Sequence, residues 1–148
     1  MSARTILIVG YGNELRGDDG LGPRVVREIR ALNIPGVHCI EAHQLLPELA
    51  PELAAHDVVL FVDAIRKGEN EPVRVTPLSP TPTLNEPHVS DPAGMLALAK
   101  VLYQKCPAAW LITVPGLQFE FSESISPEAE KALKQAVEVI RALVESLR

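Results

Sequence analysis

Positive charge, aromatic residues and cysteine are all scarce in this chain of 148 residues. Lysine and arginine number 14 against 19 aspartates and glutamates, so the net charge is −5, and no basic block favours binding to nucleic acid. No apolar run approaches the roughly 18 residues of a membrane span, so we expect no membrane contact. Residues 1–10 lack a charged leader and a small-residue cleavage site, and are typical of a strand rather than of a signal peptide. These absences predict a soluble, cytoplasmic protein.

Cysteine chemistry and the common protease motifs are also missing. Cys39 and Cys106 are far apart and form no Cys-x-x-Cys pair, so we expect buried small hydrophobic residues rather than a disulfide or a zinc site. The chain has no Gly-x-Ser-x-Gly elbow, and no cysteine at a helix start beside a candidate base, so a nucleophilic mechanism finds little support. His-Glu-x-x-His is absent too, which excludes a metalloprotease of that kind.

The chain does contain a regular succession of apolar strands and amphipathic stretches. Hydrophobic residues make up 47% of it, and no repeat or linker divides it, so residues 1–148 are expected to form a single domain. Strands that alternate with helices predict the α/β class with a mostly parallel sheet. The expected strands are Thr5–Gly10, Val37–Glu41, Asp57–Asp63, Pro72–Pro77 and Ala109–Val114, and the expected helices are Gly20–Leu32, Leu45–Ala55, Pro92–Lys105 and a C-terminal helix from Pro127.

Local signals refine this pattern. Only the eight residues 64–71 separate the third and fourth strands, whereas a parallel crossover needs about a dozen, so the fourth strand is expected to run antiparallel. Pro47 and Pro51 predict a late start or a kink in the second helix. Asp91 and Ser126 each precede a proline and are expected to cap the third and fourth helices.

The first strand breaks into glycines and then into two adjacent acids, Asp18 and Asp19, where a helix is expected to begin. A helix N-terminus is electropositive and attracts phosphate, and carboxylates placed there would repel a pyrophosphate. One of the two acids can be a simple helix cap, but one cap does not account for both. The pattern indicates a site for a cation.

Two further polar residues are expected near the same sheet edge. Asp63 ends the third strand, and His88 lies shortly before the third helix. Right-handed crossovers place the first and third strands side by side with the second outside, so Asp19 and Asp63 would flank the point where strand order reverses. Two carboxylates and an imidazole suit Zn²⁺, Ni²⁺ or Mn²⁺. The alternatives are a turn-forming role for Asp63 and an exposed loop position for His88.

Two ways of activating water remain open for such a site. Two acids in different environments can act as an aspartic-type pair, and a metal can activate a bound water.

In their order along the chain these residues resemble the hydrogenase maturation endopeptidases, the nickel-dependent proteases that trim the large subunits of nickel–iron hydrogenases. The resemblance lies in Gly10-Tyr-Gly-Asn13, Gly17-Asp-Asp-Gly-Leu-Gly22, Val62-Asp-Ala64 and His88, with further similarity over 116–120 and 124–127. It implies a three-layer sandwich with a twisted five-stranded sheet between helices.

The resemblance also implies an activity and a set of ligands. Asp19, Asp63 and His88 match the metal-binding and catalytic positions, the first of which is often glutamate in relatives; Asp18 matches an acid that is usually not a ligand. The implied reaction removes a C-terminal extension from a large-subunit precursor once nickel is in place, with Ni²⁺ carried by the precursor and a free enzyme without metal. Nothing in the sequence demands a stable dimer, so we expect the free enzyme to be a monomer. The segment His43–Ala50 resembles the branch that serves bidirectional, NAD(P)-linked hydrogenases.

Two other functions remain open from the sequence. A Rossmann-type nucleotide-binding module could use Glu41 as its ribose-binding acid, although the loop reads Gly10-x-Gly12-x-x-Leu15 and lacks the third glycine. A non-catalytic adaptor that binds a metalloprotein would need the same surface as the protease.

Overall fold

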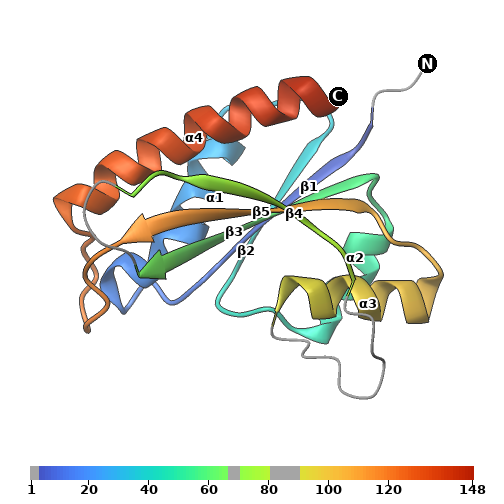
Figure 1. Cartoon of the computed structure of the whole chain (residues 1–148), viewed down its shortest axis with the longest axis horizontal. Coiled ribbons are helices and arrows are strands. Elements are labelled where there is room, and N and C mark those ends of the chain that lie inside the picture. The colour runs from blue at the N-terminus through green and yellow to red at the C-terminus, as the bar shows by residue number, and fades with distance from the viewer. Residues whose placement is uncertain (1–3, 67–70, 81–90) are drawn as a thin grey trace.

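The structure, a computed structural model, describes residues 4–66, 71–80 and 91–148. In these residues five strands form one sheet in the order β2-β1-β3-β5-β4 (Figure 1). The strands are β1 (Ile6–Tyr11), β2 (Val37–Ala42), β3 (Val58–Arg66), β4 (Arg74–Leu78) and β5 (Ala108–Gly116). The helices are α1 (Leu21–Ala31), α2 (Ala50–Ala54), α3 (Pro92–Tyr103) and α4 (Pro127–Leu147), and short 3₁₀ turns η1 (Gly17–Gly20) and η2 (Pro47–Leu49) precede α1 and α2.

The topology confirms the predicted α/β class. Strands β2, β1, β3 and β5 are parallel, and β4 pairs with β5 in the antiparallel sense. Strand β1 lies between β2 and β3, as right-handed crossovers require. The carboxyl ends of β1 and β3 therefore lie side by side at the switch point of the sheet.

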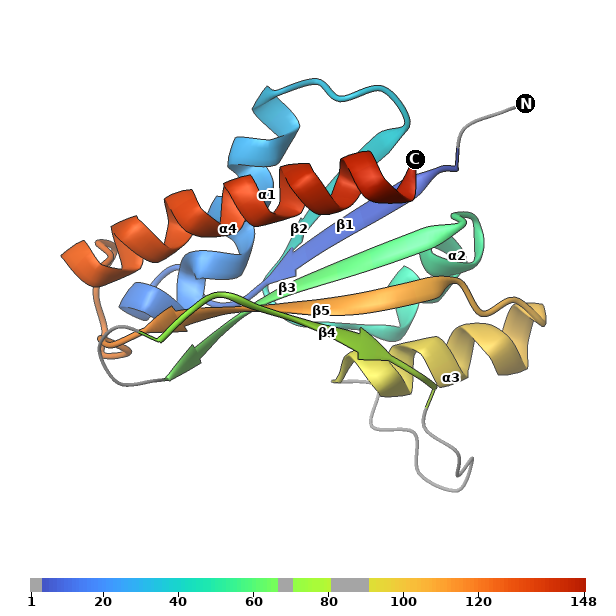
Figure 2. The ribbon, with the colours of Figure 1, turned by 45° about the horizontal axis from the view of Figure 1, so that its top comes forward.

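Helices cover both faces of the sheet, as expected for a three-layer sandwich (Figure 2). Alternate strand residues face α1 and α4 on one side, where Ile8, Leu60 and Ile112 are fully buried. The residues between them face α2 and α3, where Val9 and Phe61 are fully buried. Because parallel strands are covered on both faces, they read in the sequence as continuous apolar runs.

Both predicted caps are present. The Asp91 carboxylate accepts a hydrogen bond from the Gly94 amide at 2.7 Å, and the Ser126 hydroxyl accepts one from the Ala129 amide at 3.1 Å. The second helix also starts late, as predicted, because the chain at Pro47 first forms the turn η2.

Two local expectations were wrong, and one alternative is excluded. The acids Asp18 and Asp19 lie in η1, directly before α1, and neither side chain caps a helix, which excludes the capping alternative. Strand β3 does not end at Asp63 but continues to Arg66, because β5 pairs with it along its whole length. Cys106 is exposed in the connection between α3 and β5, and only Cys39 is part of the core boundary.

Candidate functional site

The turn after β1 depends on glycine. Gly12 has a φ of +148°, and a Cβ atom there would collide with the carbonyl oxygen of Asp19. Gly22 lies so close to the sheet that a Cβ would come within 2.6 Å of the carbonyl oxygen of Val62. These close approaches hold η1 and the start of α1 directly against the carboxyl ends of β1 and β3.

Asp18 is fully buried and ties three segments together. Its carboxylate accepts hydrogen bonds from the amides of Leu117 (2.8 Å), Gln118 (2.9 Å) and Ser126 (2.8 Å), and from the Ser126 hydroxyl (2.7 Å). Burial raises the pKa of this carboxyl, but the four hydrogen bonds together outweigh burial and hold the pKa below its ordinary value. Asp18 is thus an ionised structural residue that fixes η1 to the loop between β5 and α4.

Asp19 is the next residue of η1. Its Oδ2 accepts a hydrogen bond from the Asn13 amide at 2.8 Å, and its own amide donates to the carbonyl of Arg16 at 3.1 Å. The carboxylate is partly buried and fixed by the turn on both sides.

Asp63 occupies the adjoining position on β3. Strand β1 pairs with β3 up to Gly10 and Val62, so the next residues of the two strands, Tyr11 and Asp63, continue the same register. The Tyr11 hydroxyl donates a hydrogen bond to Asp63 Oδ2 at 3.2 Å. Both side chains lie on the sheet face that α2 and α3 cover, since the alternate residues Val9 and Phe61 belong to that core.

The surroundings of Asp63 raise the pKa of its carboxyl well above that of an ordinary aspartate. Burial raises its pKa most, the hydrogen bond from Tyr11 lowers it, and the negative charge of Asp19 raises it, so that the pKa reaches about 6. Burial, followed by the charge of Asp63, also raises the pKa of Tyr11, which therefore stays protonated and acts as a donor. An acid with a strongly raised pKa, next to a second acid at a sheet edge, is a candidate for chemistry.

The third predicted site residue, His88, lies outside the described residues. The first described residue after it is Asp91, whose charge contributes to raising the Tyr11 pKa, so the start of α3 lies near the Tyr11–Asp63 pair. Within the described ranges no group of three His, Cys, Asp or Glu side chains could hold a metal ion. The structure therefore brings together two of the three predicted ligands, Asp19 and Asp63.

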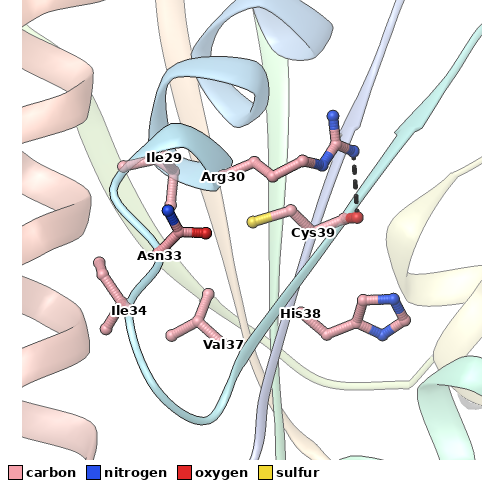
Figure 3. Close-up of a pocket in the computed structure, with 7 residues that line it drawn as sticks. All are labelled: Ile29, Arg30, Asn33, Ile34, Val37, His38 and Cys39. Carbon is pink, nitrogen blue, oxygen red and sulfur yellow. Dashed lines mark hydrogen bonds between the residues drawn. The ribbon is translucent and has the colours of Figure 1, made fainter.

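His38, His56 and one hollow formed by described residues lie away from the carboxylate pair, at the other edge of the sheet. One hollow of about 400 Å³ lies between the end of α1 and the start of β2, at the opposite edge of the sheet (Figure 3). There Arg30 donates to the carbonyl of Cys39 at 3.1 Å. His38 stacks on His56 with ring centroids 5.5 Å apart, near the starts of β2 and β3. None of these residues faces the carboxylate pair.

Glu41, the candidate ribose ligand of a nucleotide-binding module, is engaged otherwise. Its carboxylate accepts a hydrogen bond from Arg27 at 2.6 Å and also pairs with Arg30. Burial raises the pKa of Glu41, but the two arginines lower it further and keep it ionised. The structure thus gives no support to the nucleotide-binding alternative.

Sequence reasoning missed Tyr11. A tyrosine at the end of an apolar strand is typical of a core position, and nothing local links it to a residue 52 positions away. The link follows only from the register of β1 and β3.

Comparisons with known proteins identify the class and the family. No family model matches the chain. The hydrogenase maturating endopeptidase HybD from E. coli has a similar fold, with a TM-score of 0.75 at 22% identity over 96% of this chain and 93% of that one. The nickel–iron hydrogenase maturation protease HycI from Thermococcus kodakarensis KOD1 gives a TM-score of 0.73 at 27% identity, again over 96% and 93% of the two chains.

The fold is thus that of the HybD-like α/β proteins. A protein of Methanocaldococcus jannaschii assigned as a hydrogenase maturation protease is 32% identical over 149 residues, which cover 95% of this chain and 96% of the relative. The chain therefore belongs to the hydrogenase maturation protease family and is a hydrolase of the peptidase type. Among the described residues, no helix has both the length and the hydropathy that crossing a lipid bilayer requires.

Proposed function

We propose that this protein removes the C-terminal extension of a nickel–iron hydrogenase large-subunit precursor after nickel insertion. In this proposal Asp19, Asp63 and His88 recognise the nickel that the precursor carries. The observation that carries it is the pair of carboxylates at the switch point of the sheet, where burial, and to a lesser extent the charge of Asp19, raises the pKa of Asp63. Two carboxylates that lie together, one of them with a raised pKa, favour a cation as their partner.

The donor set suits nickel on chemical grounds. Carboxylate oxygens and an imidazole nitrogen bind divalent first-row metals, and three protein ligands leave coordination positions for groups of the substrate. Asp19 is held by the turn and Asp63 by a strand and the Tyr11 hydroxyl, so both are fixed before any ion arrives.

The chain length supports the inclusion of His88. Only three residue steps separate it from Asp91, the N-cap of α3, and three extended residues span at most about 10 Å. Asp91 itself lies on the side of Asp63, because its charge contributes, after burial and the effects of Asp63, to the raised pKa of Tyr11.

Two ways of promoting the attack of water on the peptide bond fit the site. The nickel of the precursor can polarise the scissile carbonyl or lower the pKa of a bound water. Alternatively Asp63, with a pKa of about 6, is largely ionised at neutral pH and is poised to accept a proton from water.

The segment His43–Ala50 supports a role in receiving the precursor. It follows β2 at the carboxyl edge of the sheet, where Leu46 is 43% exposed while Leu45 is buried. We propose that this segment contributes to the selection of a bidirectional, NAD(P)-linked hydrogenase as substrate.

The test is to mix the purified protein with nickel-loaded and with nickel-free precursor and to measure product masses. We expect cleavage of the nickel-loaded form only, and loss of cleavage in Asp19→Asn, Asp63→Asn and His88→Gln. Asp57→Asn is the matched control, because Asp57 precedes the same strand β3 at the opposite edge, and within the described part of the chain its carboxylate accepts hydrogen bonds only from Thr5.

Each other outcome is informative. Equal processing of both precursor forms, or full activity of Asp19→Asn and Asp63→Asn, would refute nickel recognition by these residues. A stable complex without any change in mass would favour the adaptor function instead.

A further inference from the structure

Tyr11 is the one described side chain that donates a hydrogen bond to the carboxylate of Asp63. Its oxygen lies 3.2 Å from Oδ2, and the contact joins residues that are neighbours across two parallel strands. Because both backbones are fixed in the sheet, the hydroxyl and the carboxylate meet without any loop having to close.

The environment makes this contact directional. The Tyr11 ring packs against the core beneath α2 and α3, which limits the positions that its hydroxyl can adopt. A tyrosine hydroxyl is protonated at neutral pH and an ionised carboxylate can only accept, so Tyr11 donates and Asp63 accepts. A hydrogen bond of this kind restricts the orientation of a carboxylate that binds a metal.

We infer that Tyr11 is a positioning residue, which holds the Asp63 carboxylate through Oδ2 in the orientation in which it meets the nickel of the precursor. This inference rests on the proposed role of Asp63 as a ligand. It assigns to Tyr11 no contact with the substrate.

A purely structural role is the competing explanation. In that case the ring fills the core and the hydroxyl merely satisfies its hydrogen-bonding capacity at the nearest acceptor. Removing the hydroxyl would then change stability but not the presentation of Asp63.

The variant Tyr11→Phe separates the two explanations, because it keeps the ring and removes only the donor. Tyr103→Phe is the matched control, since Tyr103 is the other of the two tyrosines and lies 42% exposed at the end of α3. We expect Tyr11→Phe to lower kcat for nickel-loaded precursor about 10- to 100-fold, the usual effect of losing a group that orients a ligand, with KM little changed. Tyr103→Phe should match the wild type.

A second readout needs neither nickel nor activity. With ¹³C-labelled aspartate, the carboxyl resonance of Asp63, assigned by its loss in Asp63→Asn, should move in Tyr11→Phe and stay in Tyr103→Phe. In the unaltered protein the same resonance should show a deuterium isotope shift through the Tyr11 hydroxyl, a measurement that stands even if Tyr11→Phe fails to fold.

The experiments distinguish a wrong role for Tyr11 from a wrong proposed function. Full processing by Asp63→Asn would overturn the proposed function itself. An inactive Asp63→Asn together with a wild-type kcat in Tyr11→Phe would overturn only the role of Tyr11. An Asp63 resonance without an isotope shift, or one that Tyr11→Phe leaves in place, would overturn it as well.

Discussion

Replacing Asp63 by asparagine should stabilise the protein at neutral pH. The pKa of Asp63 is about 6 in the folded protein against 3.8 for an unperturbed aspartate, mainly because burial disfavours the charge. At about 1.4 kcal/mol per pKa unit, the ionised side chain costs about 3 kcal/mol of folding free energy. Asparagine has nearly the same shape, carries no charge and still offers an oxygen to the Tyr11 hydroxyl.

The pH dependence has a definite sign. The folded state binds the Asp63 proton more tightly than the unfolded state, so this contribution to stability is fully present below pH 3.8 and is lost as the pH rises through 6. Relative to Asp63→Asn, the wild type should therefore lose about 2 kcal/mol between pH 4.5 and pH 7.5. The full difference of about 3 kcal/mol corresponds to a rise in Tm of about 6–12 °C for the variant above pH 7.

Urea unfolding of both proteins over this pH range measures the difference directly, and the other titrating groups cancel. Asp57→Asn serves as a control of opposite sign, because hydrogen bonds from Thr5 lower the pKa of Asp57, and wild-type stability relative to that variant should fall at low pH. A stability difference between wild type and Asp63→Asn that is independent of pH would refute the argument.

Three further changes test the anchors of the site. Asp18→Asn should lower the free energy of unfolding by about 3 kcal/mol in urea titrations at pH 7, because an amide nitrogen would face buried donors. This loss should shrink as the pH falls below 3.8, because folding lowers the pKa of Asp18 and the wild type therefore loses stability in acid. Gly12→Ala should lower the free energy of unfolding by about 1–3 kcal/mol in thermal unfolding and slow precursor processing, because a φ of +148° is strained for alanine and the added Cβ would displace Asp19. Wild-type behaviour of this variant in both assays would contradict the close approach of Gly12 to Asp19. Glu41→Gln should cost less than about 1 kcal/mol in the same titrations, because its arginine partners are about half exposed, and a larger loss would show that this ion-pair network is structural.

The sequence was sufficient for the fold because the signals involved are local. Apolar runs, proline positions and the short connection expected between the third and fourth strands each determine one element or one connection, and together they leave few topologies. The placement of Asp19 and Asp63 at one edge followed from that topology. The end of β3 was misjudged because pairing with β5, a distant strand, extends it past Asp63.

The separate roles of the two adjacent acids could not be derived in the same way. Asp18 and Asp19 are indistinguishable by local pattern, and what divides them is a set of donors about 100 residues later in the chain, at Leu117, Gln118 and Ser126. Those donors become visible only when the loop after β5 is placed in space. Long-range hydrogen bonds of buried polar groups are thus the part of a site that a single sequence hides best.

The contrast between Asp18 and Asp63 also bears on what the site is for. Both carboxylates lie at the same edge, yet Asp18 accepts four hydrogen bonds and folding lowers its pKa, whereas burial and Asp19 raise the pKa of Asp63. The same fold that satisfies the Asp18 carboxylate completely leaves the ionised Asp63 carboxylate at a cost of about 3 kcal/mol in folding free energy. Such local instability is typical of residues kept for function rather than for stability. Under the proposed function the positive charge of the precursor's nickel would offset this cost by favouring the ionised form of Asp63, so part of the affinity for the nickel-loaded precursor would come from a carboxylate that the protease itself leaves poorly stabilised.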